Sequence, residues 1–353
     1  MAATNKVRAA SSAKPRWPKD PVTRYALDVV AGKIIAGPHV RAACARHLRD
    51  IEHGGKRGLV WDSAAALHAI AYFEEVLCLN GGDYEGVPFK LLGWQKFIVG
   101  SLFGWKTPDG YRRFRNSYVE TGKGSGKSPL AAGIGMFGLT ADGESRAEIY
   151  AGATKKDQAM VLFRDAVAMY QLSPELRARL KASGTGENVW NLAYHDTGSF
   201  FRPISADDGQ SGPRPHIALI DEIHEHKTNT TVEMLRAGTK SRRQALIFMI
   251  TNSGSSKTSP CWSYHDYGAK VAAGILEDDS FFAYICSLDD ADDPFTDENC
   301  WAKANPSLQH ADLPGLKYLR EQVREARGMP SKEATVRRLN FCQWTQAENP
   351  WIS

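Results

Sequence analysis

The chain has 353 residues, of which 42% are hydrophobic and 24% charged, with a formal net charge of +4. This balance is typical of a globular protein and argues against disordered, collagen-like and membrane classes; the length suits about two domains, or one large α/β core with helical additions. No apolar stretch approaches the roughly 20 residues of a membrane helix, and the basic N-terminus lacks the apolar segment of a signal peptide. We therefore expect a cytosolic protein without a membrane partner.

Cysteine spacing and local charge add two expectations. The six cysteines are scattered without a C-x-x-C pair, which predicts reduced thiols rather than a disulfide framework or a zinc cluster. Residues 1–60 hold 12 Lys and Arg against 4 Asp and Glu. This basic start is compatible with a phosphate-rich partner and equally with a solvated basic arm and helix face.

The N-terminal part is predicted to be helical after a flexible start. Residues 1–20 are rich in Ala, Ser, Lys and Arg and lack periodicity, so we expect a flexible basic arm. In residues 21–85 apolar side chains recur at three- and four-residue steps, which predicts a helical N-terminal subdomain. An amphipathic helix is expected to follow residues 88–95 and to end before the turn sequence of residues 107–110.

Short apolar strands then alternate with helices within a core predicted over residues 86–288. Helices are expected near residues 127–139, 156–170 and 230–237. Strands separated by helices indicate parallel βαβ units, with a mainly parallel sheet covered on both faces. Residues 289–345, an acidic loop followed by a charged helix at about 314–327, are expected to form a lid subdomain. The strand candidates are residues 116–120, 147–152, 199–205, 216–221, 245–251 and 281–286.

The strongest motif is a glycine-rich segment at residues 121–128, TGKGSGKS, placed between a predicted strand and a predicted helix. This context is that of a phosphate-binding loop, in which backbone amides and a helix N-terminus bind phosphate oxygens. We expect Lys127 to reach the β- and γ-phosphates of ATP and Ser128 to hold Mg²⁺. Thr121 stands where the usual pattern has a glycine. The predicted ATP-binding residues of the loop are Lys123, Gly124, Ser125, Gly126, Lys127 and Ser128.

A second motif, residues 216–222, is an apolar strand that ends in two carboxylates. Such a Walker B strand would place Asp221 in the Mg²⁺ shell and leave Glu222 to polarise the attacking water as the catalytic base. Together the two motifs predict an ATPase. The expected fold is α/β, a P-loop NTPase of the additional-strand catalytic-glutamate type, with helical N-terminal and C-terminal additions.

Two further segments are candidates for contact with the nucleotide. Thr251 and Asn252 end an apolar strand, and at the carboxyl edge of the sheet they would lie beside the γ-phosphate and couple its state to motion. Trp94 and Gln95 precede the phosphate loop and could stack on and hydrogen-bond adenine; a core tryptophan on an amphipathic helix is the other interpretation of Trp94.

Some acidic and histidine residues are interpreted as structural. His224 and His226 follow the Walker B strand, and at this spacing they fit surface or supporting groups better than metal ligands. The aspartates between residues 289 and 293 resemble a divalent-metal cluster, yet such acidic loops most often bind nothing.

The combination of motifs resembles the large terminase subunit of tailed double-stranded DNA bacteriophages, the ATPase that packages the genome into the procapsid. Members of this family often carry a basic residue early in the phosphate loop, and Lys123 matches that position. The resemblance covers most of residues 20–350. It rests on residues 120–128, 151–159, 219–222, 251–254 and 301–307.

The resemblance implies a translocating motor for double-stranded DNA that assembles as a ring, usually a pentamer, on the portal protein of the procapsid and is assisted by a small terminase subunit. It implies a location in the cytoplasm of the infected host bacterium, transiently at the portal vertex. It also implies a second, nuclease domain. We expect residues 346–353 to begin a linker to that domain and the chain to lack nuclease activity.

Arg214 is a candidate arginine finger. It lies in a glycine- and proline-rich loop just before the Walker B strand, and the amino end of a strand lies away from its own phosphate site. In a ring, Arg214 would therefore serve the neighbouring subunit more easily than its own, and such a guanidinium stabilises charge on the γ-phosphate. A surface arginine in a turn is the plainer interpretation, and Arg242 and Arg243 are rival fingers.

The sequence leaves two other functions open. Residues 221–224, Asp-Glu-Ile-His, resemble the DExH box of helicase-type nucleic-acid translocases, which need a second RecA-like domain with an arginine-rich motif. A non-enzymatic, nucleotide-dependent scaffold for capsid assembly is the third interpretation.

Overall fold

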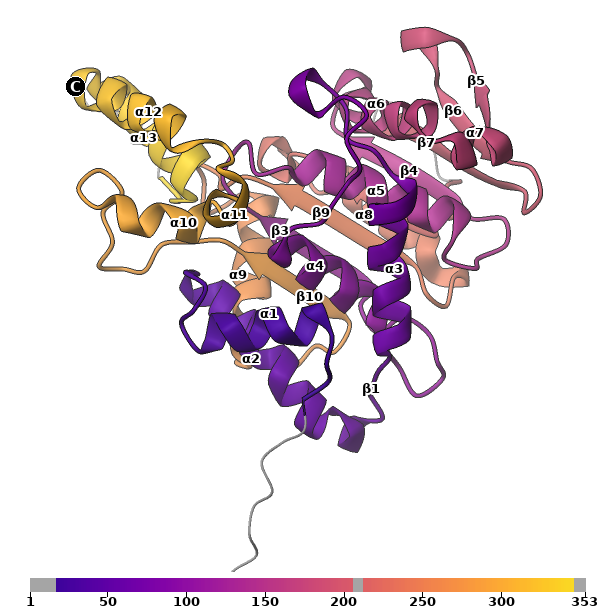
Figure 1. Cartoon of the computed structure of the whole chain (residues 1–353), viewed down its shortest axis with the longest axis horizontal. Coiled ribbons are helices and arrows are strands. Elements are labelled where there is room, and N and C mark those ends of the chain that lie inside the picture. Colours follow the sequence, from indigo (N-terminus) through magenta and orange to yellow (C-terminus); the bar gives the residue numbers. More distant parts are fainter. Residues whose placement is uncertain (1–16, 206–211, 346–353) are drawn as a thin grey trace, which may run out of the picture.

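The computed structural model describes residues 17–205 and 212–345, and within them an eight-stranded sheet forms the centre of the molecule (Figure 1). The strand order is β10-β3-β9-β8-β4-β7-β6-β5. All neighbours from β10 to β7 are parallel, and β6 and β5 extend the sheet in antiparallel fashion. The strands are β3 (Asn116–Glu120), β4 (Glu148–Ala153), β5 (Lys181–Ser183), β6 (Asn191–Tyr194), β7 (Ser199–Ser205), β8 (Ile217–Ile220), β9 (Leu246–Thr251) and β10 (Phe281–Ile285).

The six predicted strands are confirmed within one residue at each end, but two short pairings were missed. The first is the antiparallel extension of β5 and β6, and the second is a separate two-stranded sheet of β1 (Val60–Trp61) and β2 (Trp105–Lys106). Segments of two to four residues are too short to show an alternating pattern, and their pairing is decided by neighbours distant in sequence.

Helices cover both faces of the sheet. The first, α1, begins where Asp20 accepts hydrogen bonds from the backbone of Val22 and Thr23, with Pro21 in the first helical position. The helices are α1 (Pro21–Val30), α2 (Pro38–His53), α3 (Ser63–Val76), α4 (Gly93–Gly104), α5 (Lys127–Thr140), α6 (Lys156–Leu172), α7 (Pro174–Arg179), α8 (Thr230–Gly238), α9 (Pro260–Ala273), α10 (Trp301–Ala304), α11 (Leu308–Ala311), α12 (Leu316–Gly328) and α13 (Pro330–Phe341).

The core is divided into two hydrophobic clusters by the sheet, and β8 contributes to both. Ile217 and Leu219 belong to the cluster under α5 and α6, whereas Ala218 and Ile220 belong to the cluster under α8 and α9. Since alternate residues of a strand point to opposite faces, a strand covered on both sides must be apolar throughout. This explains the continuous apolar run before Asp221.

The strand order confirms the predicted fold class. The strand before the phosphate loop, β3, does not pair with the Walker B strand, β8; β9 lies between them and pairs in parallel with both. This inserted strand is the feature that distinguishes the additional-strand branch of P-loop proteins. It also places the end of β9 directly between the two motifs.

Residues after Gly254 complete the same sheet and then form a helical cap. The segment adds α9 and β10, and α10 to α13 follow at the upper left of the view (Figure 1). A second RecA-like sheet, which the helicase interpretation requires, is not found among the described residues. All six cysteines are free thiols, as expected. None of the helices in the described part of the chain is long and apolar enough to cross a membrane.

Candidate nucleotide-binding site

The loop between β3 and α5 has the backbone of an anion-binding site. Gly124 and Gly126 adopt φ values of +87° and +86°, a left-handed conformation that side chains with a Cβ rarely tolerate. Within the described chain, no group accepts a hydrogen bond from the N–H of Gly124, Ser125 or Gly126. These donors stand at the N-terminus of the fourteen-residue helix α5, whose dipole favours a negative charge.

Lys127 is buried at the start of α5, with 7% of its surface exposed. Its Nζ donates hydrogen bonds to the carbonyl oxygens of Thr121 (3.1 Å) and Gly122 (3.2 Å), so the ammonium group lies inside the curve of the loop. Burial lowers the pKa of Lys127, against the raising effect of the carboxylates of Glu222 and Asp221. The side chain is therefore held in the position from which it can reach a bound phosphate.

Asp221 directly follows β8. Its side chain points toward the phosphate loop, on the other side of the end of β9. Its Oδ2 lies 3.5 Å from the hydroxyl of Ser128, and its Oδ1 accepts a hydrogen bond from the backbone N–H of Glu222 (2.8 Å). Burial, and then the charge of Glu222, raises the pKa of Asp221 to about 7. A carboxylate and a hydroxyl oxygen side by side are ligands that Mg²⁺ prefers, and a divalent cation would favour the ionised form of Asp221.

Glu222 has a less buried side chain, 38% exposed, on a residue with φ of +48°. Its Oε2 lies 3.1 Å from Nδ1 of His224. Burial by itself would raise the pKa of Glu222, but the adjacent imidazole of His224 and the charge of Lys127 outweigh this effect and lower it. Glu222 is therefore ionised at neutral pH and accessible to water.

Thr251 and Asn252 connect the two motifs. The amide Nδ2 of Asn252 donates a hydrogen bond to the carbonyl oxygen of Thr121 (2.9 Å), in the phosphate loop. The hydroxyl of Thr251 accepts a hydrogen bond from the backbone N–H of His224 (3.1 Å), just after the carboxylates. Both side chains are buried. Through these two hydrogen bonds, the predicted coupling residues contact both the phosphate loop and the segment after the carboxylates.

The C-terminal cap closes over the phosphate loop. The N–H groups of Gly122 and Lys123 donate to the carbonyl oxygens of Ala304 (2.9 Å) and Leu339 (2.7 Å). Gly122 is required here because a Cβ would lie 2.2 Å from Oδ1 of Asn305. The cap therefore packs on the first turn of the loop, while the amides of residues 124–126 stay open.

A cavity of about 400 Å³ adjoins these open amides. Gln95 lies in its wall, and its Oε1 accepts a hydrogen bond from the backbone of Leu92 (2.8 Å). Trp94 is only 1% exposed, stacks on Tyr284 and donates its Nε1–H to Ser307, so the core interpretation is correct and stacking of Trp94 on adenine is excluded. The mainly apolar remainder of the wall includes Leu79, Tyr84, Val87, Phe89 and Leu92.

The three candidate finger arginines differ in the exposure of their side chains and in the contacts that hold them. Arg214 lies before β8, at the edge of the sheet opposite to the phosphate loop; its side chain is 70% exposed, with Nε 3.7 Å from Oε1 of Glu148. Arg242 is fixed by Glu144 and by several backbone carbonyls, and Arg243 donates to the hydroxyl of Tyr111 (2.8 Å). Among contacts with residues 17–205 and 212–345, Arg214 is therefore the least restrained of the three.

Sequence reasoning gave no specific role to two side chains next to the site, His224, which it interpreted only as a surface or supporting group, and Glu120. His224 contacts both Glu222 and Thr251, and its neighbour His226 lies with Nε2 3.3 Å from the carbonyl oxygen of Asp221. Glu120, fully buried at the end of β3, accepts hydrogen bonds from Tyr118 (2.8 Å) and from Trp344 (3.1 Å). The sequence signal for Glu120 was its position: a charged residue at the end of a mostly apolar strand, directly before the phosphate loop.

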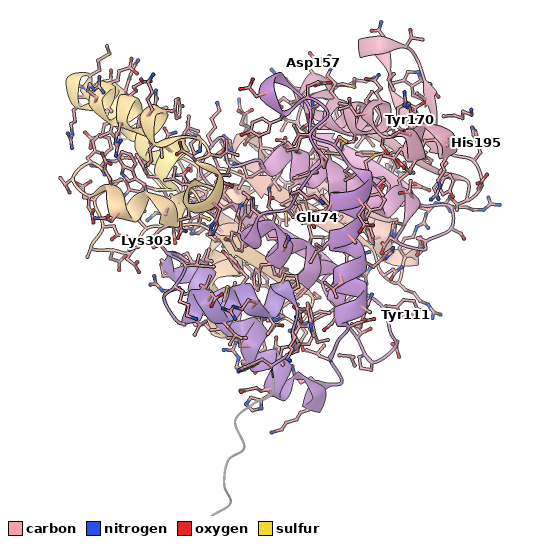
Figure 2. All side chains as sticks on the ribbon, viewed as in Figure 1. Glu74, Tyr111, Asp157, Tyr170, His195 and Lys303 are labelled. Atoms are coloured by element: carbon pink, nitrogen blue, oxygen red, sulfur yellow. The ribbon has the colours of Figure 1, made fainter. Side chains whose placement is uncertain are left out.

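The acidic segment around residue 290 is occupied by ion pairs. Lys303, labelled in Figure 2, bridges Asp289 and Asp292 at 2.7 Å each, and Arg337 pairs with Asp293 at 3.0 Å. In residues 17–205 and 212–345 no cluster of three or more His, Cys, Asp or Glu side chains has a metal-binding arrangement. These aspartates attach the loop to α10 and α13.

Comparison with known proteins gives two family matches and similar relatives. The model of the terminase large subunit ATPase domain matches residues 93–270, and that of the terminase large subunit endonuclease domain matches residues 275–353. The large terminase subunit of Enterobacteria phage HK97 is 23% identical over 290 residues, which are 80% of this chain and 54% of that protein. Protein YmfN of Escherichia coli K12 is 34% identical over 97 residues, 28% of this chain and 21% of that protein.

The fold has a counterpart among solved structures. The crystal structure of the HK97 bacteriophage large terminase superimposes with a TM-score of 0.68 and 21% identity, over 79% of this chain and 55% of that one. The chain thus spans about half the length of the terminase subunit that it matches along most of its own length.

The endonuclease match requires a correction. It covers residues 275–353, which include the end of the predicted core (to residue 288), the predicted lid (289–345) and the predicted linker (346–353), so the expectations of a chain without nuclease sequence and without nuclease activity lack support. In the structure the described part of this stretch forms β10 of the central sheet and α10 to α13. The ATPase-domain model matches half of the chain and spans both β3 and β8 with the loop between them, and on this ground the chain belongs to the terminase large subunit family.

Proposed function

We propose that the chain is a phage DNA-packaging motor that hydrolyses ATP with Mg²⁺ and uses the energy to translocate double-stranded DNA into a procapsid. The observation that carries the proposal is the approach of Ser128, in the first turn of α5, to Asp221, directly after β8, at 3.5 Å. The strands that precede them, β3 and β8, are separated by β9. This juxtaposition of a phosphate loop and an acidic strand end is the arrangement that phosphoryl transfer from a nucleotide triphosphate needs.

In this proposal the phosphates bind at the open amides of residues 124–126. Lys127 would exchange the carbonyl oxygens of Thr121 and Gly122 for β- and γ-phosphate oxygens, which costs little because the ammonium group already lies within the loop. Ser128 and Asp221 would hold Mg²⁺, which neutralises charge on the phosphates. Lys123, on the same loop, adds positive charge beside Glu222.

The base and sugar of the nucleotide fit the adjoining cavity. Its volume of about 400 Å³ lies in the range of small-ligand pockets, and its walls are largely apolar with one convergent amide, Gln95. A Cβ built on Gly126 would lie 3.6 Å from Nε2 of Gln95, so the amide is close to the phosphate loop. Gln95 is therefore suited to hydrogen-bond the base edge while the apolar walls contact its face.

Glu222 is the proposed general base. It is ionised at neutral pH, partly exposed to water and next to the phosphate loop, which are the properties that proton abstraction from an attacking water requires. Thr251 and Asn252 are proposed to transmit the state of the γ-phosphate, because they are hydrogen-bonded to both sides of the site.

The partners follow from the family. We propose double-stranded DNA, the portal protein, a small terminase subunit and further copies of this chain in a ring, usually a pentamer, in the cytoplasm of an infected bacterium. Arg214 is proposed as the finger supplied to the neighbouring subunit, in agreement with its exposure at the far edge of the sheet.

Steady-state ATP hydrolysis with and without linear double-stranded DNA tests the proposal. We expect Mg²⁺-dependent turnover that DNA stimulates. Turnover stimulated only by single-stranded DNA, with strand displacement, would favour the helicase interpretation. A Glu222→Gln protein as active as the parent would contradict a catalytic role and favour the scaffold interpretation.

A further inference from the structure

We propose that His224 is a positioning residue that orients the catalytic base Glu222 and connects it to the coupling residue Thr251. This inference rests on the proposed ATPase function and assigns a specific role to a histidine that the sequence analysis interpreted only as a surface or supporting group. His224 lies in the short 3-10 helix Ile223–Glu225 that follows the Walker B carboxylates, and its side chain is 10% exposed.

One imidazole nitrogen of His224 lies within hydrogen-bond distance of two oxygen atoms. Nδ1 of His224 lies 3.1 Å from the hydroxyl oxygen of Thr251 and 3.1 Å from Oε2 of Glu222. The geometry of a hydrogen bond is met between Nδ1 and the Thr251 hydroxyl. Oε2 of Glu222, in contrast, is buried and has no hydrogen-bond donor among the described residues. A small rotation of the imidazole therefore exchanges its hydrogen bond between the two residues.

The hydrogen-bond pattern fixes where the proton must be. The hydroxyl of Thr251 donates its proton to the carbonyl oxygen of Asn252 (2.8 Å) and so can only accept from His224. An ionised carboxylate also only accepts. Both neighbours therefore require a proton on Nδ1, and this requirement holds for the neutral and for the charged ring.

The contact extends into the phosphate loop. Asn252, which follows Thr251, donates its Nδ2–H to the carbonyl oxygen of Thr121 (2.9 Å), and the same oxygen accepts from Nζ of Lys127 (3.1 Å). A continuous series of contacts thus runs from the base Glu222 through His224 and β9 to the lysine that would bind phosphate. Movement of Lys127 onto a γ-phosphate would remove its hydrogen bond to the carbonyl oxygen of Thr121. Through Asn252 and Thr251, this change would alter the hydrogen bonding of His224.

Glu222 needs such support because its own position restrains it weakly. Its side chain is 38% exposed, and among the described Lys, Arg and His residues only His224 has a nitrogen within ion-pair distance of its carboxylate. Misplacement of a catalytic group by about 1 Å can reduce a rate by roughly 100-fold. We therefore expect loss of the imidazole to lower kcat.

The test compares two amides at position 224. In His224→Asn the amide nitrogen can occupy the place of Nδ1, whereas in His224→Gln the longer side chain carries it to the place of Nε2. We expect His224→Ala and His224→Gln to lower kcat roughly 10- to 100-fold with KM for ATP little changed, and His224→Asn to keep most of the activity. His195→Ala, at an exposed position far from the cap (Figure 2), is the control and should match the parent.

A double variant separates positioning from folding. If His224 acts through Glu222, adding His224→Ala to Glu222→Gln should not lower the residual turnover further, while binding of a fluorescent ATP analogue should stay within about threefold. Independent, multiplying losses would overturn the proposal, as would equal activities of the Asn and Gln variants, and this last comparison decides even if His224→Ala fails to fold. Inactivity of the parent protein, or full activity of Glu222→Gln, would instead refute the proposed function.

Discussion

The indole N–H of Trp344 donates a hydrogen bond to the buried carboxylate of Glu120, with 3.1 Å between Nε1 and Oε1. Glu120 ends β3 directly before the phosphate loop, and Trp344 lies just beyond α13. A Cβ on Gly254 would lie 2.7 Å from the indole, so Trp344 also packs on the loop after β9. The C-terminal part of the described chain is thereby attached to the start of the nucleotide site through one carboxylate, which Tyr118 and His265 also contact at 2.8 Å each.

Trp344→Phe should lower the free energy of unfolding by about 1–3 kcal/mol, because Glu120 would lose one of its donors while remaining buried. Urea unfolding followed by circular dichroism measures the change. Trp190→Phe is the matched control, since Trp190 is 54% exposed, and its effect should be small. Equal effects of the two substitutions would contradict the importance of the Trp344 contact.

The Walker B carboxylates should separate binding from turnover. Glu222→Gln should bind ATP nearly normally and lose turnover by roughly 100-fold or more, because it removes the base but keeps the shape of the side chain. Asp221→Ala should also weaken Mg²⁺-dependent binding, because it removes a proposed ligand of the cation. ATP binding measured over a Mg²⁺ titration, beside steady-state hydrolysis, distinguishes them; equal and mild effects would refute the assignment.

Asp165, on α6, should make stability depend on pH. Burial raises its pKa to about 6, against the lowering effect of the hydrogen bond from Asn80. Because the folded pKa exceeds the unfolded value of about 3.8, the stability that the neutral carboxyl supports is complete below pH 4 and is lost as the pH rises through 6. Asp165→Asn should therefore stabilise the protein at pH 8, by at most about 3 kcal/mol, and by about half as much at pH 5, where only part of this stability has been lost.

Unfolding free energies of the parent and of Asp165→Asn at pH 5 and pH 8 test this expectation. Asp196→Asn, at an exposed position in the turn between β6 and β7, is the control and should show no such difference. A gain that is the same at both pH values would show that ionisation of Asp165 is not its cause.

Arg214 should act across a subunit interface. Mixtures of Arg214→Ala and Lys127→Ala subunits, each inactive alone, should regain part of the ATPase activity, because a wild-type phosphate loop would then meet a wild-type arginine of its neighbour. Arg243→Ala, at another exposed arginine, serves as the comparison. Full DNA-stimulated turnover of the Arg214→Ala protein in an assembled motor would eliminate the finger.

The sequence by itself determined the six parallel strands of the central sheet and the two motifs. The segments 116–120 and 216–221 are apolar runs bounded by polar residues, and the loop of residues 121–128 must follow a strand and precede a helix to bind phosphate. These properties depend on residues a few positions apart, so local chemistry was enough to predict them. The two motifs also predicted the additional-strand fold class, and the place of β9 between β3 and β8 confirms it.

Only the tertiary structure decided which side chains from distant segments meet. The contact of His224 with Thr251 joins residues 27 positions apart, that of Trp344 with Glu120 joins residues 224 positions apart, and the burial of Trp94 depends on Tyr284 and Ser307. No periodicity in the sequence encodes such pairs, because they arise when parallel strands and the C-terminal cap bring their ends to one edge of the sheet. The residues that give the site its chemistry are thus specified by short segments of sequence, whereas the contacts that hold its catalytic groups in place come from long-range packing.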